Sequence, residues 1–569
     1  MSETQALDLT AKNTQTVGTY IKSGQPYVWL TAAAISVSFI VTVALLCLTA
    51  ARGMPHFWPS DLLRAEYVEP GQAPVPLLVE LVDSEEVSSA RLKSAGVTLT
   101  DEKPFHSRDL VKVANRDLYG ADFRYLLDDW VSNRSYPADA VTLERTEWGN
   151  FHGFIVGVKQ DGKLIAEGDQ VWAAYLPLQR RANELREKLH ELEGGEIGNI
   201  NYGLEQVRLD GRRLAIDGKT PETAPEAFQK LAERKADFEA QYEKVRSGLA
   251  AIKTDMRRDA LLLKTVDGQE KELALSDIVR AYRPNEMGLF AKTSLYFAKL
   301  WEFVSAEPRE ANTEGGIFPA IFGTVMMVLL MSVFVTPFGI LAALYLREYA
   351  KQGPVTQVIR IAVNNLAGVP SIVYGMFGLG FFVYFLGGNI DKILYAESLP
   401  APTFGTPGIL WASLTLAILT LPVVIVATEE GLARIPRSIR EASLSLGATK
   451  AETLWKIVLP MASPAMMTGL ILAIARAAGE VAPLMLVGVV KLAPSLPLDG
   501  NFPFVHLERK FMHLGFHIYD VGFQSPNVEA ARPLVYATSF LLVLVIILLN
   551  ISAIRIRNRL REKYKALEG

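Results

Sequence analysis

Two ionisable side chains lie within one long apolar run of the sequence. Arg476 and Glu480 are the charged residues of the stretch MMTGLILAIARAAGEVAPLMLVG at positions 466–488. A charge near the centre of a bilayer costs about 2.5 to 3.5 kcal/mol on insertion scales, so a retained pair indicates a function. On a helix, residues four apart share one face. We interpret the pair as part of a polar pathway, with a self-neutralising structural pair as the alternative.

The chemistry of this pair suits a tetrahedral oxyanion. A planar guanidinium such as that of Arg476 binds an oxyanion through two parallel hydrogen bonds. Phosphate still carries a proton at neutral pH and can donate it to the Glu480 carboxylate, whereas sulfate is fully ionised and cannot. We therefore hypothesise that Glu480 selects phosphate over sulfate. Asn364, Asn365 and the break before Ser371 indicate a second polar wall, with ordinary helix packing as the alternative.

The most specific motif lies between two later apolar runs. It reads Glu441, Ala442, Ser443, then three residues, Gly447, nine residues and the run IVLP that ends at Pro460. We expect a short helix that ends at Gly447, followed by a second helix that re-enters the membrane at Pro460. A small element projecting from rigid spans can carry movement from a soluble motor into them. The chain contains no GxxxxGK[ST] sequence, so an ATPase would be a separate polypeptide.

Six apolar windows predict six membrane helices. The first is longer than the apolar part of a secretory signal and is interpreted as an uncleaved anchor. The chain has a single cysteine, Cys47, and this count excludes internal disulfides and multi-cysteine metal sites. We interpret Cys47 as a small apolar residue of the anchor. The windows are 28–50, 317–346, 361–386, 408–427, 464–490 and 534–554.

The distribution of basic residues predicts the topology. With the N-terminus inside, the inner segments carry 16 Lys and Arg, against five in the short outer loops 387–407 and 491–533. We expect a cytoplasmic segment 1–27, a cytoplasmic loop 428–463 within a membrane domain 316–555, and a basic cytoplasmic tail 556–569 beside membrane lipid. Residues 51–315 would be periplasmic. A net charge of -3, with no dense basic run before the tail, argues against nucleic-acid binding.

The outer block 51–315 reads as a charge-rich α+β domain with 45 acidic and 36 basic residues. Asp161-Gly162 and Asp267-Gly268 each separate two apolar runs, which predicts two β-hairpins. Heptad spacing within about 170–258 predicts an antiparallel coiled-coil hairpin, with Asp210-Gly211 in the connecting segment. This hairpin is either an arm that docks a partner or a structural spacer.

The histidines do not form a catalytic or metal-binding pattern. We expect isolated surface or capping histidines in the outer block and a surface group in the last outer loop, which has no carboxylate at metal-ligand spacing. The former are His106, His152 and His190, and the latter are His506, His513 and His517.

Several segments of residues 312–560 resemble one transporter family. They are EGGIFPAIFGT at 314–324, TPFGILAALYLREY at 336–349, GVPSIVYG at 368–375, the motif at 441–460 and ARAAGEVAPL at 475–484. The motif at 441–460 matches the EAA loop of ABC-importer permeases, with Ser443 in place of the second alanine. Together the segments resemble the PstA-type permease subunits of phosphate-specific ABC importers.

This resemblance implies the six-helix fold of a type I importer permease in a bacterial inner membrane, without catalytic activity or a cofactor of its own. It implies a homologous PstC-type permease subunit, two copies of a PstB-type ATPase that uses the ATP, and a PstS-type phosphate-binding protein. Arg476 would lie on the translocation path. Glu441, Ala442, Gly447 and Pro460 would belong to the loop that docks on the ATPase. The long outer block departs from the short members of the family.

Two other functions fit the same residues. The cargo could be another oxyanion, such as sulfate, molybdate or phosphonate. Alternatively, the chain could be a membrane scaffold that reports phosphate status without carrying flux. A transport subunit and such a scaffold are separated by whether replacing Arg476 by alanine abolishes uptake while leaving signalling intact.

Overall fold

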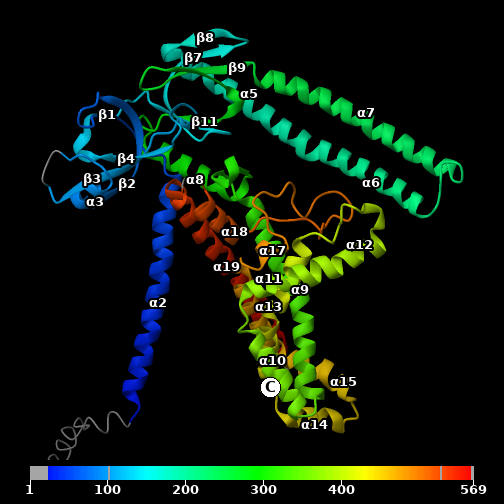
Figure 1. The fold of residues 1–569 in the computed structure, drawn as a ribbon. Coiled ribbons are helices and arrows are strands. Elements are labelled where there is room, and N and C mark those ends of the chain that lie inside the picture. The colour runs from blue at the N-terminus through cyan, green and yellow to red at the C-terminus, as the bar shows by residue number, and fades with distance from the viewer. Residues whose placement is uncertain (1–22, 100–102, 526–527, 566–569) are drawn as a thin grey trace, which may run out of the picture.

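Six helical segments in the described part of the chain are long and apolar enough to cross a membrane, as predicted. The structure is a computed structural model that describes residues 23–99, 103–525 and 528–565. A sheet-containing part lies at one end of a helical bundle, and a pair of long helices projects from it (Figure 1). The spans are Pro26–Phe57, Phe318–Tyr349, Ser371–Leu394, Ile409–Ala433, Lys450–Ala478 and Ala531–Arg559.

Two of the predicted helices have the wrong limits. The third was expected at 361–386, but α10 (Pro354–Leu366) ends before a break, and the span starts with α11 (Ser371–Phe377). Pro370 causes this break, because a proline disfavours helical geometry in the residue before it. The fifth was expected to reach 490, but α16 (Leu459–Ala478) ends earlier and a short α17 (Leu484–Val487) follows. Pro483 has no N–H and its ring would clash with the carbonyl of Gly479.

The core of the bundle is built around α13 (Ile409–Ala433), which lies between α9 (Phe318–Leu344) and α16. Of its apolar window, 67% is buried. A Cβ atom on Gly339 of α9 would come within 2.6 Å of Val424 Cγ1, and one on Gly469 of α16 within 2.7 Å of Ala427 Cβ. Small residues at these positions allow the three helices to approach closely.

The remaining elements of the membrane part connect or flank these helices. The third span continues from α11 through a π-helical segment, Gly378–Gly387, into α12 (Gly388–Leu394). The inner loop holds α14 (Arg437–Ser445), α15 (Lys450–Thr453) and the π-helical segment Leu454–Val458. After α18 (Leu514–Tyr519), the long α19 (Val528–Lys565) packs against α16.

The first membrane helix, α2 (Gln25–Gly53), stands apart from the bundle along most of its length (Figure 1). It meets α19 at its outer end, where a Cβ atom on Gly53 would lie 2.4 Å from the backbone nitrogen of Ala537. None of its apolar window is buried within this chain, and Cys47 is exposed on it. This helix therefore has a surface that only lipid or another membrane subunit can cover.

Residues 51–315, which we call the outer part after the side of the membrane expected for them, contain two antiparallel sheets. The first has the order β4-β3-β2-β1-β5, and the second has the order β10-β9-β7-β6-β11 with β8 paired to β7. Both predicted hairpins are confirmed: Asp161 and Gly162, with φ of 49° and 73°, join β7 to β8, and the turn with Gly268 joins β9 to β10. The strands are β1 (Leu62–Tyr67), β2 (Val75–Ser88), β3 (Phe105–Lys112), β4 (Phe123–Leu127), β5 (Val131–Ser135), β6 (Val141–Arg145), β7 (Phe151–Gln160), β8 (Lys163–Glu167), β9 (Asp259–Lys264), β10 (Glu270–Ala274) and β11 (Ile278–Tyr282).

Several helices accompany these sheets. Short helices α3 (Ser89–Ser94) and α4 (Arg116–Tyr119) lie within the first half of the outer part. Helix α8 (Leu289–Ser305) follows β11 and leads through the small strands β12 (Pro308–Arg309) and β13 (Glu314–Gly315) into α9. The outer part is therefore tied into the membrane part at both of its ends.

The heptad region forms a helical hairpin, which we call the arm. Helix α5 (Val171–His190) packs on the second sheet and continues through a π-helical segment, Glu191–Glu196, into α6 (Ile197–Ile216). Helix α7 (Pro225–Met256) returns beside it (Figure 1). The prediction that Asp210-Gly211 lies in the connecting segment is wrong, because both residues are inside α6. A single glycine inside a helix costs only about 1 kcal/mol and does not end it. A coiled-coil geometry for this pair stays a prediction.

Candidate functional site

The predicted ionic pair lies at the end of a helix. Arg476 belongs to the last turn of α16, and Glu480 follows that helix, in the turn that leads to Pro483. The expectation that both residues lie on one face of a helix is therefore wrong, because Glu480 lies beyond the end of α16. The two side chains still meet, with Nε of Arg476 3.6 Å from Oε1 of Glu480, and they keep 35% and 20% of their surface exposed. A cation and an anion are thus held beside each other, and neither is fully buried within this chain.

Helix α11 forms the neighbouring wall of this site. A Cβ atom on Gly375 would come within 2.7 Å of Cα of Pro483, so α11 packs directly against the turn that follows Glu480. The hydroxyl of Tyr374 donates to the carbonyl of Leu366 at 2.6 Å and thereby ties α11 to the end of α10. The GVPS break thus places α11 in close backbone contact with the turn that follows the ionic pair.

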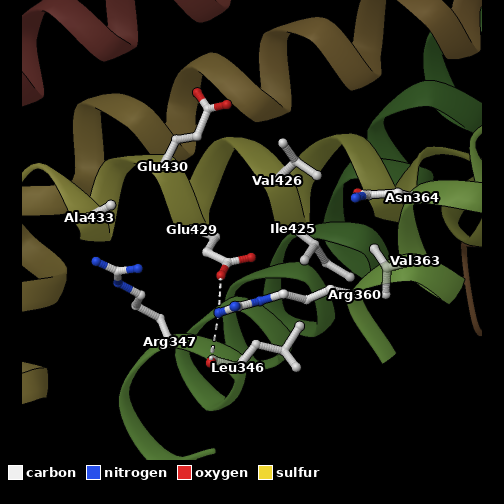
Figure 2. A pocket seen from close by; sticks show the side chains of 10 residues that line it. All are labelled: Leu346, Arg347, Arg360, Val363, Asn364, Ile425, Val426, Glu429, Glu430 and Ala433. Carbon is white, nitrogen blue, oxygen red and sulfur yellow. Dashed lines mark hydrogen bonds and ion pairs between the residues drawn. The ribbon is translucent and has the colours of Figure 1, made fainter. Parts of the chain in front are cut away.

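Of the three weaker candidates, one lines a pocket elsewhere in the bundle. Asn364 and Asn365 are exposed on α10, and Ser371 is half-buried at the start of α11. Asn364 instead lines a pocket of about 280 Å³ between α10, α13 and the end of α9 (Figure 2). A role of Asn365 and Ser371 in a polar wall stays a prediction, whereas the packing assigns Asn364 to this pocket.

This pocket contains a second ionic pair that sequence reasoning missed. Arg360 of α10 lies 2.6 Å from Glu429 of α13 and donates to the carbonyl of Leu346 at 3.3 Å (Figure 2). Arg347 and Glu430 complete its charged lining. Both members of the pair lie just outside the predicted apolar windows, and only Arg360 enters the count of basic residues in the inner segments. The signal that could have found them is the continuation of helical periodicity past the apolar run in α13.

The inner loop folds as its sequence predicts. Helix α14 is followed by Gly447 at φ 87°, a left-handed conformation that glycine adopts without strain. Thr449 then caps α15: its hydroxyl accepts from the backbone N–H of Glu452, whose carboxylate accepts from the Thr449 N–H. The chain continues without interruption from α15 through Pro460 into α16. One continuous helical segment therefore joins this loop to Arg476.

Buried polar contacts hold the inner loop on the bundle. Arg440 pairs with Glu348 at 2.8 Å and donates to two carbonyls at the end of α13. The Ser443 hydroxyl, at the position of the family's second alanine, lies 2.8 Å from the hydroxyl of Thr453, and both residues are buried. In contrast, Glu441 is exposed and Leu446 keeps 90% of its surface exposed. The loop is anchored on one side and presents an apolar tip on the other.

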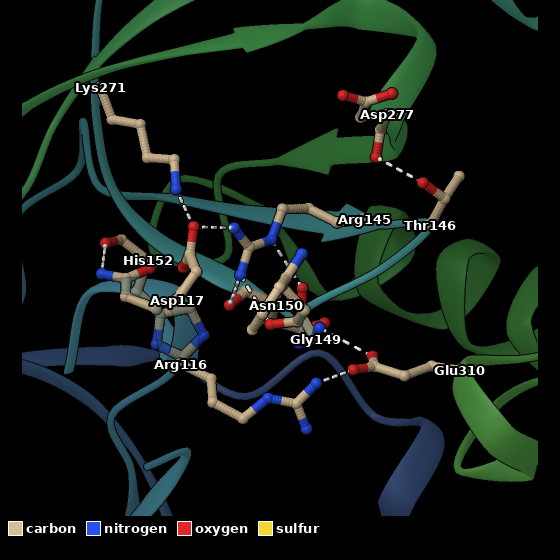
Figure 3. Close-up of polar contacts among 12 residues, drawn as sticks. Arg116, Asp117, Arg145, Thr146, Gly149, Asn150, His152, Lys271, Asp277 and Glu310 are labelled. Atoms are coloured by element: carbon tan, nitrogen blue, oxygen red, sulfur yellow. Dashed lines mark hydrogen bonds and ion pairs between the residues drawn. The ribbon is translucent and has the colours of Figure 1, made fainter. Parts of the chain in front are cut away.

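A charged cluster links the outer sheets to the segment before α9. Buried Arg145 lies 3.0 Å from Asp117, to which Lys271 also pairs, and donates to the carbonyl of Gly149 at 2.8 Å (Figure 3). Glu310 accepts from the N–H of Gly149 at 2.8 Å and pairs with Arg116. Burial lowers the pKa of Arg145 to about 10, so it stays charged at neutral pH. The charges are matched by partners, and we interpret this cluster as structural.

The arm contacts the outer loops of the membrane part. Arg213 of α6 pairs with Glu397, and the hydroxyl of Tyr202 donates to the carbonyl of Phe502. The side-chain amide of Asn501 donates to that of Asn199 at 3.1 Å. These contacts place α6 over the segments 396–398 and 501–502. The arm is thus attached to the loops that surround the outer end of the bundle.

The expectations for the histidines were mostly wrong. His106 and His152 are buried in the outer part, and all three histidines of the last outer loop are buried as well. His513 caps α18 by accepting from the N–H of Gly515, and His506 lies between Asp499 and Glu508. Burial lowers the pKa of His152 to about 3. Among the residues that the structure describes, no group of three His, Cys, Asp or Glu could hold a metal ion.

Comparisons with known proteins match the membrane part. Residues 335–565 match the family model described as "Binding-protein-dependent transport system inner membrane component". "Phosphate transport system permease protein PstA" of Mycobacterium leprae (strain TN) is 37% identical over 188 residues, or 33% of this chain and 56% of that protein. The chain thus spans little more than half of this relative.

Two further relatives are covered more fully. "Phosphate transport system permease protein PstA 1" of Mycobacterium tuberculosis (strain CDC 1551 / Oshkosh) is 34% identical over 43% of this chain and 71% of that protein. "Phosphate transport system permease protein PstA" of Yersinia pestis is 30% identical over 53% of this chain and 97% of that protein.

Proposed function

Because the chain belongs to the family of binding-protein-dependent transport system inner membrane components, the non-catalytic permease subunits of ABC importers, we propose that its cargo is inorganic phosphate. The observation that carries this proposal is the pairing of Arg476 with Glu480 at 3.6 Å, on a partly exposed turn beside α11. The relatives named for phosphate transport support the same cargo.

The two side chains contact different groups of the anion. The guanidinium of Arg476 binds two oxygens of the anion, and the carboxylate of Glu480 accepts the proton that phosphate retains at neutral pH. Sulfate has no such proton and would place an oxygen lone pair against the carboxylate. In the empty site Glu480 holds Arg476 in place. The pair thus serves both as a binding site and as a discriminator.

The partners follow from the same proposal. The loop with Glu441, Ala442, Gly447 and Pro460 docks on a separate PstB-type ATPase, whose movement reaches Arg476 through α15 and α16. A PstC-type permease subunit completes the pathway, and a PstS-type protein delivers phosphate. This loop lies at the end of the bundle opposite the sheets (Figure 1), which supports cytoplasmic termini and a periplasmic outer part. The excess of basic residues in the inner segments supports the same orientation.

The test is ATP-driven uptake of labelled phosphate by the complete complex in proteoliposomes. Two charge-assisted hydrogen bonds are worth about 3 to 6 kcal/mol, and the partial exposure of Arg476 favours the lower end, so Arg476→Ala should lower uptake about 100-fold. Arg476→Lys keeps the charge but loses the second bond, and about a tenfold loss is expected. Arg208→Ala is the matched control, because this exposed arginine pairs with Glu205 on the arm. Uptake unchanged in Arg476→Ala would refute the site.

Glu480→Gln tests the discrimination between anions. We expect weaker phosphate uptake and stronger competition by sulfate, each by about tenfold or more, since one hydrogen bond to a charged group is worth about 1.5 to 3 kcal/mol. If neither phosphate uptake nor competition by sulfate changes, Glu480 does not accept the proton of phosphate. If the wild-type complex carries sulfate, molybdate or phosphonate in preference to phosphate, the cargo assignment is wrong. If it carries no anion, the role of a signalling scaffold replaces it.

A further inference from the structure

Helix α8 (Leu289–Ser305) turns its charged face toward the protein and its apolar face outward, the reverse of a water-exposed helix. Its charged residues face the protein: Lys292 lies 2.5 Å from Asp61, and Lys299 lies 2.6 Å from Glu144. Its outward face is apolar, with Phe290, Phe297 and Trp301 exposing 89%, 63% and 71% of their surface. The remaining outward residues are uncharged: Leu289, Ala291, Ser294, Ala298 and Ser305.

The inward face of α8 is built into the rest of the chain. The Phe303 ring lies 4.9 Å from that of Phe57, and the Tyr296 ring lies 5.9 Å from that of Trp58. Lys299 also donates to the hydroxyl of Tyr282 at 3.0 Å. The orientation of the helix is therefore set by aromatic packing and ion pairs together. The apolar face cannot rotate inward without breaking them.

The position of α8 places this apolar face at membrane level. Phe57, which α8 contacts, is the last residue of the first membrane span. At the other side, the N–H of Ile317 donates to the carbonyl of Phe303 at 2.8 Å, directly before Phe318 begins the second span. Figure 1 shows α8 at the outer end of α2. The helix is thus fastened to the outer ends of two spans.

We propose that α8 lies in the outer-leaflet interface of the bilayer, with Phe290, Phe297 and Trp301 among the lipids. The helix packs on the end of the first span, none of whose apolar window is buried within the chain. Aromatic side chains are favoured at the boundary between lipid tails and headgroups, and a helix with one such face lies in the plane of that boundary. An exposed aromatic patch of this kind marks an interaction surface.

The position of α8 in the membrane interface also affects the outer part. The ion pair of Lys299 with Glu144 joins α8 to β6. This strand belongs to the second sheet, on which α5, the base of the arm, packs. The bilayer surface thereby sets the height of the sheets, and through them the height at which α6 meets the outer loops. The outer part is then supported by lipid as well as by the bundle.

The experiment measures the surroundings of α8 with nitroxide labels. In a Cys47→Ser background, which removes the single natural cysteine, Phe297→Cys and Trp301→Cys are labelled in the full chain within its complex, in nanodiscs of phosphatidylethanolamine and phosphatidylglycerol. Ser294→Cys, on the same face, is a nearly isosteric variant that keeps the test valid if loss of an aromatic side chain impairs folding. Collision rates with oxygen, which enters lipid, and with a water-soluble nickel chelate are compared.

Two reference positions define the scale. A label on Val41→Cys in α2 represents lipid, and one on Glu239→Cys in the arm represents water. The proposal expects the α8 labels to favour oxygen over nickel severalfold, as Val41→Cys does. Nickel accessibility equal to that of Glu239→Cys would overturn it, since the face would be in water. Low accessibility to both reagents would also overturn it, since another protein would then cover the face.

Discussion

The buried hydroxyl pair of the inner loop allows a quantitative test of how the loop is held together. Ser443 and Thr453 are both buried, and their hydroxyl oxygens are 2.8 Å apart. Ser443→Ala removes one partner and leaves the Thr453 hydroxyl without its hydrogen bond in a buried position, which costs about 1 to 3 kcal/mol. Thr453→Val should cost a similar amount. With both hydroxyls removed, an apolar contact remains, and the double variant should be less destabilised than the sum of the two.

The assay is hydrogen exchange of residues 441–455 in the purified complex, combined with the ratio of ATP hydrolysed to phosphate transported. Each single variant should accelerate exchange of this segment about 5- to 150-fold, the range that corresponds to about 1 to 3 kcal/mol. A loosened loop should also raise ATP use per transported ion. Ser445→Ala is the control, because its exposed hydroxyl donates to the Glu441 carbonyl within α14. Strictly additive effects in the double variant would refute the reasoning.

Two further predictions concern the outer part. Arg213→Ala should accelerate hydrogen exchange of residues 394–400 about tenfold or more, because it leaves the largely buried Glu397 carboxylate unpaired. Arg212→Ala, which changes an exposed neighbour, should not accelerate it. Equal exchange in the two variants would disprove the attachment of the arm. Burial lowers the pKa of His152 to about 3. As the pH falls below about 6.5, the unfolded state therefore binds a proton before the folded state does. The free energy of unfolding should then fall by up to about 1.4 kcal/mol per pH unit. The urea midpoint for protease resistance of the outer part should therefore drop between pH 7.5 and 5, and less so in His152→Gln; identical drops would exclude His152.

The agreement between sequence and structure is best where a feature depends on nearby residues. The six spans follow from apolar runs, and the inner loop follows from Gly447, Thr449 and Glu452. The turn at Asp161-Gly162 follows from the left-handed conformation that both residues tolerate. In each case the deciding interactions lie within a few positions along the chain.

The errors concern features that depend on distant contacts. The His152 and His513 side chains were expected at the surface, but strands and helices far away in the sequence bury them. Arg360 and Glu429 looked like unrelated loop charges until α10 and α13 were packed together. Helix α8 was not predicted as an element, because its outward aromatic residues and inward lysines follow no pattern of a soluble helix.

By itself, the sequence determined that this chain has a membrane part with six spans, an inner loop of defined shape and one arginine beside one glutamate in an apolar setting. Local hydropathy, glycine geometry and capping suffice for these features, because their physics is contained in short segments. Only the tertiary structure decided that α16 stops before Glu480, that Asn364 lines a pocket with Arg360 and Glu429, and that the arm rests on the outer loops. Those outcomes depend on which surfaces meet, and that is decided by packing between segments hundreds of residues apart.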